Sequence, residues 1–321
     1  MRPKLLLSRA ARESLAGRLT AEVSVVLLEE AASQTVDAAF ISRDVTGLST
    51  KHEIAPGLQQ CHDVLRRSPQ LQWVHTHSAG ADRPIYGELQ SRGVAVTTSS
   101  GANAEVVAQT ALAGVLMLAR HLPQLQRAQA EKRWAPLVAG PMPRDLRGQT
   151  AVLVGWGPIA RTLQPLLSLL GLRVIVVRRG EAEAAPGVPT VPFTRLHEVL
   201  PQADWLLLAC PLNARTRGLI DATALRLLPP GARLVNVARG EVVVQAELIT
   251  ALQTGVLAGA FLDVFEHEPL PADSPLWALP NVVLTPHSAG HSDGNAARVA
   301  DIFIDNLQRW LRGAPLLNKA E

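Results

Sequence analysis

Three apolar stretches in the second half of the chain are each followed by side chains that can bind anions or transfer protons. The residues that follow them are Arg239, the acidic segment from Asp263 to Glu268, and His287. In open sheets of parallel strands, ligand-facing groups lie at the carboxyl ends of the strands. A guanidinium can bind a carboxylate, and a histidine beside an acid can transfer a proton. Each residue alone has a structural interpretation, as a helix-dipole partner, a solvated charge or a buried histidine, but their shared position predicts a site.

The stretch TAVLVGWGPIAR, residues 150–161, is typical of a dinucleotide-binding turn. A short apolar run precedes the turn, and a helical pattern of leucines follows it. The turn itself is Gly155, Trp156, Gly157, Pro158, Ile159 and Ala160. Gly155 would permit a tight turn, and Gly157 would let the backbone approach a pyrophosphate held by the N–H groups of the helix start. An ordinary turn between strand and helix is the alternative, but the strand before it and the second such unit after it favour a nucleotide site.

The residues after the next apolar run, 173–177, indicate which dinucleotide is bound. NAD enzymes commonly carry an acid about 20 residues after the first glycine, where it binds the ribose hydroxyls. This chain has Arg178 and Arg179 there. Because a guanidinium can bind a 2′-phosphate bidentately, we predict that NADP is preferred and that NAD is possible. In the alternative, the arginines are solvated loop charges and Glu181 or Glu183 binds the ribose.

The elements that position these residues alternate between strands and helices, which predicts parallel sheets covered on both faces. In the first hundred residues the expected strands are 4–7, 24–28, 38–42, 71–76 and 94–98, and the expected helices are 58–67 and 84–92. The segment 77–82 is a small-residue turn after the fourth strand. Its backbone N–H groups could bind a carboxylate, although this stretch alone favours a plain connecting turn.

The middle and the end of the chain predict three further helices. Residues 101–121 form a buried helix with Asn103 as a cap, and 124–134 form a polar one in which Trp134 is a packing anchor rather than a ligand contact. A proline-rich linker covers 136–143. The last helix is 292–312, and we expect the extended piece after it to return to the amino-terminal domain.

Composition excludes several other classes of protein. The 321 residues are 47% hydrophobic and 18% charged, which is typical of a globular protein with two domains. The formal charge is only +3, and the arginines form no block of like charge, so we expect no nucleic-acid binding. The longest apolar runs are too short to span a bilayer. Cys61 and Cys210 are too few for a disulfide framework or a structural zinc site, so no metal is expected. The first residues lack a secretory signal, so we expect a cytoplasmic protein.

Five further motifs, together with their order, identify a resemblance. They are Leu146–Thr150 (LRGQT), Pro211–Ile220 (PLNARTRGLI), Asn236–Gly240 (NVARG), Leu262–Phe265 with Glu268-Pro269, and Thr285–Gly290 (TPHSAG). Over nearly its full length the chain resembles the D-isomer-specific 2-hydroxyacid dehydrogenases. The resemblance implies an α/β protein with two doubly wound parallel-sheet domains. A Rossmann NAD(P)-binding domain, 102–287, would be inserted into a flavodoxin-like substrate-binding domain, 1–101 and 288–321.

The resemblance also implies roles for individual residues. Arg239 would bind substrate, His287 would be the acid/base, and Glu268 would be its partner. Ser78, Ala79 and Gly80 would bind the substrate carboxylate, with backbone donors from the last two. Beside the glycine turn and the two arginines, the cofactor-binding residues are assigned as Cys210, Pro211, Thr216, Val237, Ala238, Asp263 and Ser288, with Asp263 on the nicotinamide side. The enzyme would transfer hydride to the C2 carbonyl of a small 2-oxo acid such as glyoxylate or hydroxypyruvate, and it would be a homodimer.

Three residues depart from the family pattern: Ala160 at the third glycine position, the arginine pair in place of an acid, and Ser288 where an apolar residue is common. The alanine is compatible with the fold, and the arginines change the expected cofactor from NAD to NADP. The serine at 288 is unexplained. A second class remains open, because corepressor relatives of this family bind nucleotides as sensors on the same fold. The fold does not separate the two classes.

Overall fold

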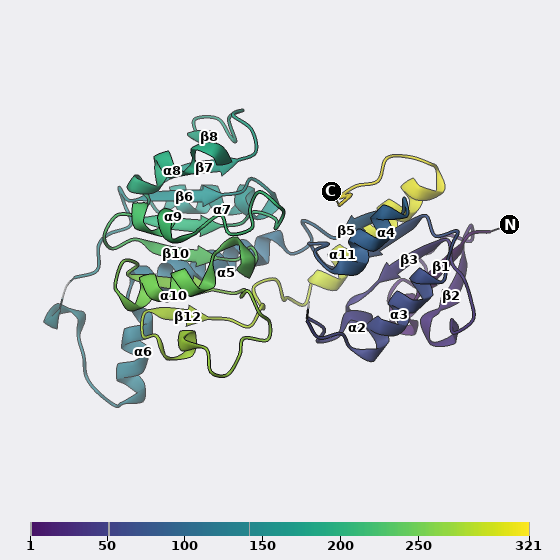
Figure 1. Ribbon diagram of the computed structural model, residues 1–321, viewed down its shortest axis with the longest axis horizontal. Coiled ribbons are helices and arrows are strands. Elements are labelled where there is room, and N and C mark those ends of the chain that lie inside the picture. Colours follow the sequence, from purple (N-terminus) through teal and green to yellow (C-terminus); the bar gives the residue numbers. More distant parts are fainter. Residues whose placement is uncertain (1, 51, 141, 321) are drawn as a thin grey trace. The chain divides into compact units, whose positions relative to one another are not determined.

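The computed structural model describes residues 2–50, 52–140 and 142–320, and the chain folds into two compact units (Figure 1). One unit combines the segment up to Asn103 with the segment from Ser292 onward, and we call it the split unit. The other, Ala104–His291, is the central unit. The boundaries predicted from the sequence, 101/102 and 287/288, fall slightly earlier. Each unit is one parallel sheet with helices on both faces, as predicted.

The split unit contains a five-stranded sheet in the order β2-β1-β3-β4-β5, with every neighbouring pair parallel. This is the flavodoxin-like order. The strands are β1 (Lys4–Leu7), β2 (Ser24–Leu27), β3 (Ala38–Ile41), β4 (Trp73–Thr76) and β5 (Ala95–Thr98). All five match the predicted strands to within a few residues at their ends.

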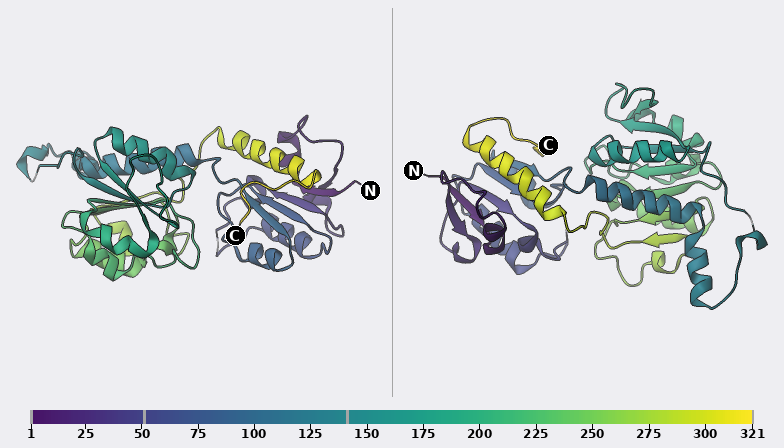
Figure 2. Two further views of the ribbon diagram at one scale, coloured as in Figure 1. Left: turned by 90° about the horizontal axis from the view of Figure 1, so that it is seen from above. Right: turned by 180° about the vertical axis from the view of Figure 1, so that it is seen from behind.

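Both faces of this sheet are covered by helices, because successive side chains of a strand point to opposite faces. The helices are α1 (Arg9–Ser14), α2 (Arg43–Thr46), α3 (Pro56–Arg66), α4 (Pro84–Ser91) and α11 (Asn295–Leu311). Leu6 packs with α3 and α4, whereas Leu5 and Leu7 pack with α1 and α11. Figure 2 shows α11, in yellow, and the blue helices on opposite sides of the strands. After α11 the chain returns to β5, where the N–H of Ala320 donates to the carbonyl of Val96, as predicted.

The central unit contains a seven-stranded parallel sheet in the order β12-β11-β10-β9-β6-β7-β8. The strands are β6 (Thr150–Val154), β7 (Arg173–Arg178), β8 (Thr190–Pro192), β9 (Trp205–Leu208), β10 (Arg233–Asn236), β11 (Gly259–Leu262) and β12 (Val282–Leu284). Counted from β6, this is the Rossmann order with a seventh strand added. The strand order reverses between β6 and β9, and dinucleotides bind at such a switch point.

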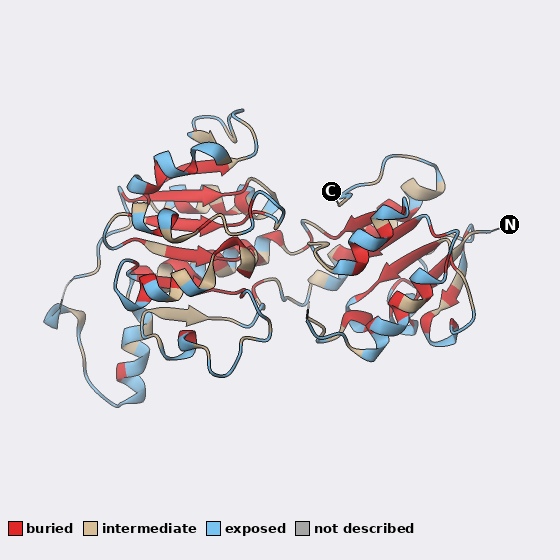
Figure 3. Ribbon diagram, viewed as in Figure 1, coloured by how far each residue is buried: buried red, intermediate tan, exposed pale blue. Residues whose placement is uncertain are grey.

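Helices cover this sheet on both faces as well. The helices of this unit are α5 (Ala104–Ala119), α6 (Leu122–Ala130), α7 (Pro158–Leu169), α8 (Leu196–Val199), α9 (Ala222–Leu227) and α10 (Gln245–Gln253), and all but α6 pack on the sheet. α5 and α7 share one apolar core with the sheet, and α8, α9 and α10 share the other. Figure 3 shows the result: the inner strands are buried, the edge strands β8 and β12 are partly buried, and the helices are buried mainly on one side. α5 lies so close to β11 that a Cβ on Gly114 would come within 2.5 Å of the ring of Phe261.

Some elements differ from the sequence-based expectations. α1, α2 and β8 were not predicted, because each is short and carries no periodic apolar pattern long enough to recognise. Trp134 is 95% exposed, so the prediction that it anchors packing within its own chain is wrong. Among the described residues, no single helix has the length and apolar composition to cross a membrane. α5 and α6 pass that test only together, and they are bent by 71°.

Candidate active site

The glycine turn joins β6 to α7 at the carboxyl edge of the central sheet. Gly155 has φ +106°, and a Cβ there would lie 2.7 Å from the carbonyl oxygen of Ala209, so only glycine fits. A Cβ on Gly157 would meet no atom within 4 Å, so this glycine leaves the space at the amino end of α7 open. Ala160 is fully buried between helix and sheet. Trp156 and Ile159 are half-buried against the same core, and Pro158 is the first residue of α7. These residues fit a dinucleotide pyrophosphate.

The two arginines lie at the end of β7, the neighbour of β6. Arg178 is half-buried and pairs with Pro192 of β8, while Arg179 is exposed. The carboxylate of Glu183 accepts a hydrogen bond from the N–H of Gly187 at 2.7 Å, within its own loop. Glu181 lies near Arg195 and acts on it electrostatically. The surroundings of the two acids therefore favour the arginines over them as the groups that face the adenosine ribose.

The turn after β9 contributes Cys210, Pro211 and Thr216. The hydroxyl of Thr216 donates to the carbonyl of Pro211 at 2.7 Å and accepts from the N–H of Asn213 at 2.9 Å, so it closes this turn. Burial raises the pKa of Cys210 to about 12. The thiol is therefore a small apolar group at neutral pH and no nucleophile.

The turn after β10 carries Arg239 and is built by Asn236, whose side chain is buried. The Asn236 amide donates to the carbonyl of Arg239 at 3.0 Å, and its oxygen accepts from the N–H of Ala238 at 3.0 Å. Val237 and Ala238 are buried, whereas Arg239 is half-exposed, with one guanidinium nitrogen 2.7 Å from the carbonyl of Ala238. A Cβ on Gly240 would overlap the backbone of Phe265, so this turn packs directly against the turn that follows β11.

Asp263, the first residue after β11, organises the loop that follows β12. Its carboxylate accepts hydrogen bonds from the hydroxyl of Thr285 at 2.6 Å and from the N–H groups of Ser288 at 2.8 Å and Ala289 at 3.1 Å. Its carbonyl accepts from the N–H of His287 at 2.8 Å. Burial raises the pKa of the Asp263 carboxyl, and these hydrogen bonds oppose that rise by favouring the carboxylate.

His287 and Glu268 lie within hydrogen-bonding distance of each other, the pairing that the family resemblance implied. The Nδ1 of His287 lies 2.8 Å from Oε2 of Glu268, and Oε1 of Glu268 accepts from the N–H of Phe265 at 3.0 Å. His287 has φ +49°, a left-handed conformation, and its side chain is 48% exposed while that of Glu268 is 17% exposed. The carboxylate thus holds Nδ1, and Nε2 is left as the ring nitrogen that could meet a ligand.

The remaining predicted residues, Ser78, Ala79 and Gly80, belong to the split unit and follow β4. Ser78 and Gly80 are half-buried, and Ala79 is exposed. The carbonyl of Ser78 accepts from the N–H of Ser99, the residue after β5, at 2.9 Å. The loop therefore lies at the carboxyl edge of its own sheet, as the residues of the central unit do at theirs.

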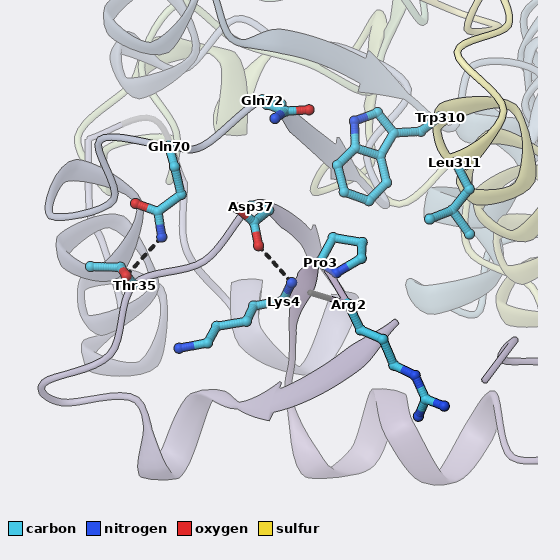
Figure 4. Close-up of a pocket in the computed structure, with 9 residues that line it drawn as sticks. All are labelled: Arg2, Pro3, Lys4, Thr35, Asp37, Gln70, Gln72, Trp310 and Leu311. Carbon is cyan, nitrogen blue, oxygen red and sulfur yellow. Dashed lines mark hydrogen bonds between the residues drawn. The ribbon is translucent and has the colours of Figure 1, made fainter. Parts of the chain in front are cut away.

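A hollow in the split unit lies at the opposite edge of the sheet. Its lining includes Arg2, Lys4, Asp37, Gln72 and Trp310, at the amino ends of β1, β3 and β4 (Figure 4). The charged ends of Arg2 and Lys4 point to different sides, and Asp37 accepts from the backbone N–H of Lys4 at 2.6 Å. Its polar groups do not converge on one point, so we assign no ligand to it.

Comparison with known families supports the interpretation of the central unit. Residues 112–289, more than half of the chain, match the NAD-binding domain of the D-isomer specific 2-hydroxyacid dehydrogenases. The chain belongs to this family. It is therefore an NAD(P)-dependent oxidoreductase that acts on 2-hydroxy acids.

Relatives extend the similarity of this dehydrogenase to the split unit. A glyoxylate reductase of Korarchaeum cryptofilum is 35% identical over 78% of this chain and 76% of its own. One of Pyrococcus furiosus is 31% identical over 98% and 94%. Among solved structures, an NADPH-dependent glyoxylate/hydroxypyruvate reductase of Sinorhizobium meliloti, in complex with NADP and malonate, has a TM-score of 0.77. It is 30% identical and covers 100% of this chain and 97% of its own.

Three residues hold the backbone of the site through hydrogen bonds that the sequence did not predict. Asn236 builds the Arg239 turn, Thr285 bonds to Asp263, and Ser99 bonds to the Ser78 loop. Asn236 and Thr285 lie inside motifs that were recognised, but a motif does not reveal which members hold the backbone. Ser99 carried no signal, since a serine after a strand is common in turns.

Proposed function

We propose that the protein is an NADPH-dependent reductase that converts a small 2-oxo acid to the D-2-hydroxy acid. The observation that carries the proposal is the His287–Glu268 pair, 2.8 Å apart at the carboxyl edge of a Rossmann sheet. A half-exposed histidine whose Nδ1 is held by a carboxylate suits a general acid for a ketone that becomes an alcohol.

The bound nicotinamide would supply the hydride. His287 would donate the proton from Nε2 to the carbonyl oxygen, and Glu268 would hold the orientation of the ring. Arg239 would bind the carboxylate and polarise the carbonyl. Asp263 would keep the backbone from Thr285 to Ala289 fixed while the proton leaves.

The substrate class rests on the carboxylate-binding groups and on the relatives. The backbone N–H groups of Ala79 and Gly80 in the split unit could bind a carboxylate, and so could the guanidinium of Arg239 in the central unit. Several relatives are named glyoxylate reductases, and the Sinorhizobium meliloti enzyme holds malonate, a dicarboxylate. Glyoxylate and hydroxypyruvate are therefore the proposed substrates.

The preference for NADP rests on Arg178 and Arg179 at the end of β7. No acid stands there to repel a 2′-phosphate, and Glu183 is bonded within its own loop. Two structures similar in fold, from Xanthobacter autotrophicus and Sinorhizobium meliloti, contain NADPH and NADP. These observations support NADP as the preferred cofactor.

We also propose that the protein is a homodimer. The segment after α6 runs out from the body of the central unit (Figures 1 and 2), and it exposes the side chains of Trp134 and Val138. Exposed apolar side chains so close together in sequence are typical of an interaction surface, and a second copy is the simplest occupant. Light scattering of the purified protein tests this proposal.

The experiment that tests the function measures oxidation of NADPH and NADH with glyoxylate, hydroxypyruvate, pyruvate and bulkier 2-oxo acids. We expect turnover with the first two and a higher kcat/KM for NADPH than for NADH. Tight cofactor binding with no turnover of any 2-oxo acid would contradict the proposal. That outcome would favour a nucleotide-sensing protein related to corepressors.

A further inference from the structure

Behind the Ser78–Gly80 loop, four buried side chains of the split unit form a continuous chain of hydrogen bonds. The Nε1 of Trp73 lies 2.8 Å from the hydroxyl of Thr97, which lies 2.7 Å from Nδ1 of His75. The Nε2 of His75 lies 3.0 Å from the hydroxyl of Ser99, which donates to the carbonyl of Thr76 at 3.1 Å. The register pairs His75 with Thr97 across β4 and β5, which places them side by side.

The direction of each bond in this chain follows from the donors and acceptors available. The indole of Trp73 can only donate, and the hydroxyl hydrogen of Ser99 goes to the carbonyl of Thr76. Ser99 must therefore accept from Nε2–H of His75, and Nδ1 of His75 must accept from the hydroxyl of Thr97. The chain thus specifies one tautomer of a neutral histidine. Burial, aided by His77, lowers the pKa of His75 to about 3, which keeps the ring neutral.

Ser99 is the link between this chain and the loop. Besides its hydroxyl bond, its backbone N–H donates to the carbonyls of Thr76 at 3.1 Å and of Ser78 at 2.9 Å. In a planar trans peptide the C=O and N–H point in opposite directions. Because the carbonyl of Ser78 faces Ser99, the N–H of Ala79 must face away from Ser99. A donor aimed away from the interior is what an anion at the edge of the sheet requires.

We infer that Ser99, oriented by the neutral His75, is a positioning residue that holds the Ser78–Gly80 loop with its N–H groups ready for the substrate carboxylate. The inference rests on the proposed function in one respect, namely that this loop binds a carboxylate. Neither residue touches the substrate. His75 orients the hydroxyl of Ser99, which holds the carbonyl of Thr76 just before the loop, and the backbone N–H of Ser99 holds the carbonyl of Ser78.

The test compares Ser99→Ala with Ser68→Ala. Ser68 is a matched control, because it is also buried, donates to a carbonyl (Val64) and accepts from a backbone N–H (Val36), but it lies away from the loop. We expect Ser99→Ala to raise KM for glyoxylate about tenfold, the effect of one weakened hydrogen bond. Its kcat and its KM for NADPH should stay within about twofold of wild type, because the carboxylate is bound equally in ground and transition states. Ser68→Ala should change neither KM.

A second variant serves if Ser99→Ala does not fold. His75→Phe keeps a ring among Phe40, Trp73 and Phe303 and removes the donor to Ser99, so it should raise the same KM. Unchanged KM for glyoxylate in either folded variant would overturn the inference. An equal rise in Ser68→Ala would also overturn it, because the effect would then be general destabilisation.

An oxalate titration followed by the amide NMR signals of Ala79 and Gly80 separates this inference from the proposed function. Weaker oxalate binding in Ser99→Ala than in Ser68→Ala supports the inference even if the wild type reduces no 2-oxo acid. Equal oxalate binding in both variants, with an active wild type, overturns the inference alone. Absence of any oxalate shift in the wild type overturns the inference together with the carboxylate role of the loop.

Discussion

Two loops of this molecule, each at the carboxyl edge of a parallel sheet, are held by opposite kinds of anchor. In the central unit, the carboxylate of Asp263 accepts hydrogen bonds from N–H groups of the His287 loop. In the split unit, Ser99 donates hydrogen bonds to the carbonyl of Ser78, which begins the Ser78 loop, and to that of Thr76, which ends β4. The first anchor is charged and the second is neutral.

The buried residue that holds a loop determines which of the loop's groups remain available to a ligand. The carboxylate of Asp263 accepts hydrogen bonds from the backbone N–H groups of the His287 loop. These N–H groups are then unavailable to a ligand, and the loop presents the side chain of His287 instead. A donor behind a loop consumes its carbonyls, so the Ser78 loop can offer N–H groups to an anion. The chemistry of each proposed subsite is therefore set by a buried residue behind the loop.

The largest effect is expected from the side chain that the charged anchor holds in place. His287→Ala removes the proposed proton donor and should lower kcat by about 10²- to 10⁴-fold, the usual contribution of a general acid. Steady-state assays with glyoxylate and NADPH measure it, and cofactor binding by the variant serves as control. Turnover equal to wild type would remove His287 from the proposed chemistry.

A smaller effect is expected from the charged anchor itself. Asp263→Ala removes the acceptor of the Thr285 hydroxyl and of the N–H groups of Ser288 and Ala289, so the loop loses what holds it and must shift. A displacement of about 1 Å can reduce turnover about 100-fold, and kcat should fall on that scale while KM for glyoxylate changes less. Asp204→Ala is the control, because Asp204 also accepts a backbone N–H, from Thr150, at the other edge of the same sheet. An equal loss in both variants would contradict the anchor role.

Arg178 and Arg179 at the end of β7 belong to neither loop, and we expect them to affect only the binding of NADPH. The double variant Arg178→Ala/Arg179→Ala should lose about 10- to 100-fold in kcat/KM for NADPH, the worth of one or two charge-assisted hydrogen bonds. Its kcat/KM for NADH should change little, and Arg226→Ala, an exposed arginine of α9, should change neither. Equal losses for both cofactors would show that the arginines do not bind the 2′-phosphate.

Features set by local backbone geometry could be predicted from the sequence, whereas those set by contacts between distant segments could not. Strands such as β6 and the turn of Gly155 were predictable because apolar runs and glycines report local backbone geometry. The approach of Glu268 to His287 was predictable only through the family resemblance, because their loops follow different strands. The anchors were not predictable in these roles, since the bonds of Asp263 and Ser99 depend on how neighbouring strand ends meet. Trp134 was misjudged because an aromatic side chain does not reveal whether it packs within its own chain.

The smallest expected effect is on the pH dependence of the free energy of unfolding, in which the two anchors differ. The pKa of His75 falls from 6.5 unfolded to about 3 folded, so between these values the unfolded chain binds more protons. The contribution of neutral His75 to the free energy of unfolding is fully present above pH 6.5. It falls by about 1.4 kcal/mol for each pH unit below that. The charged anchor responds with opposite sign, because a raised folded pKa at Asp263 makes its contribution greater as pH falls. Urea unfolding at pH 7, 6 and 5 should therefore show a shallower pH slope in His75→Phe than in wild type. His197→Gln, at an exposed site, should keep the wild-type slope, and an unchanged slope in His75→Phe would contradict a neutral His75.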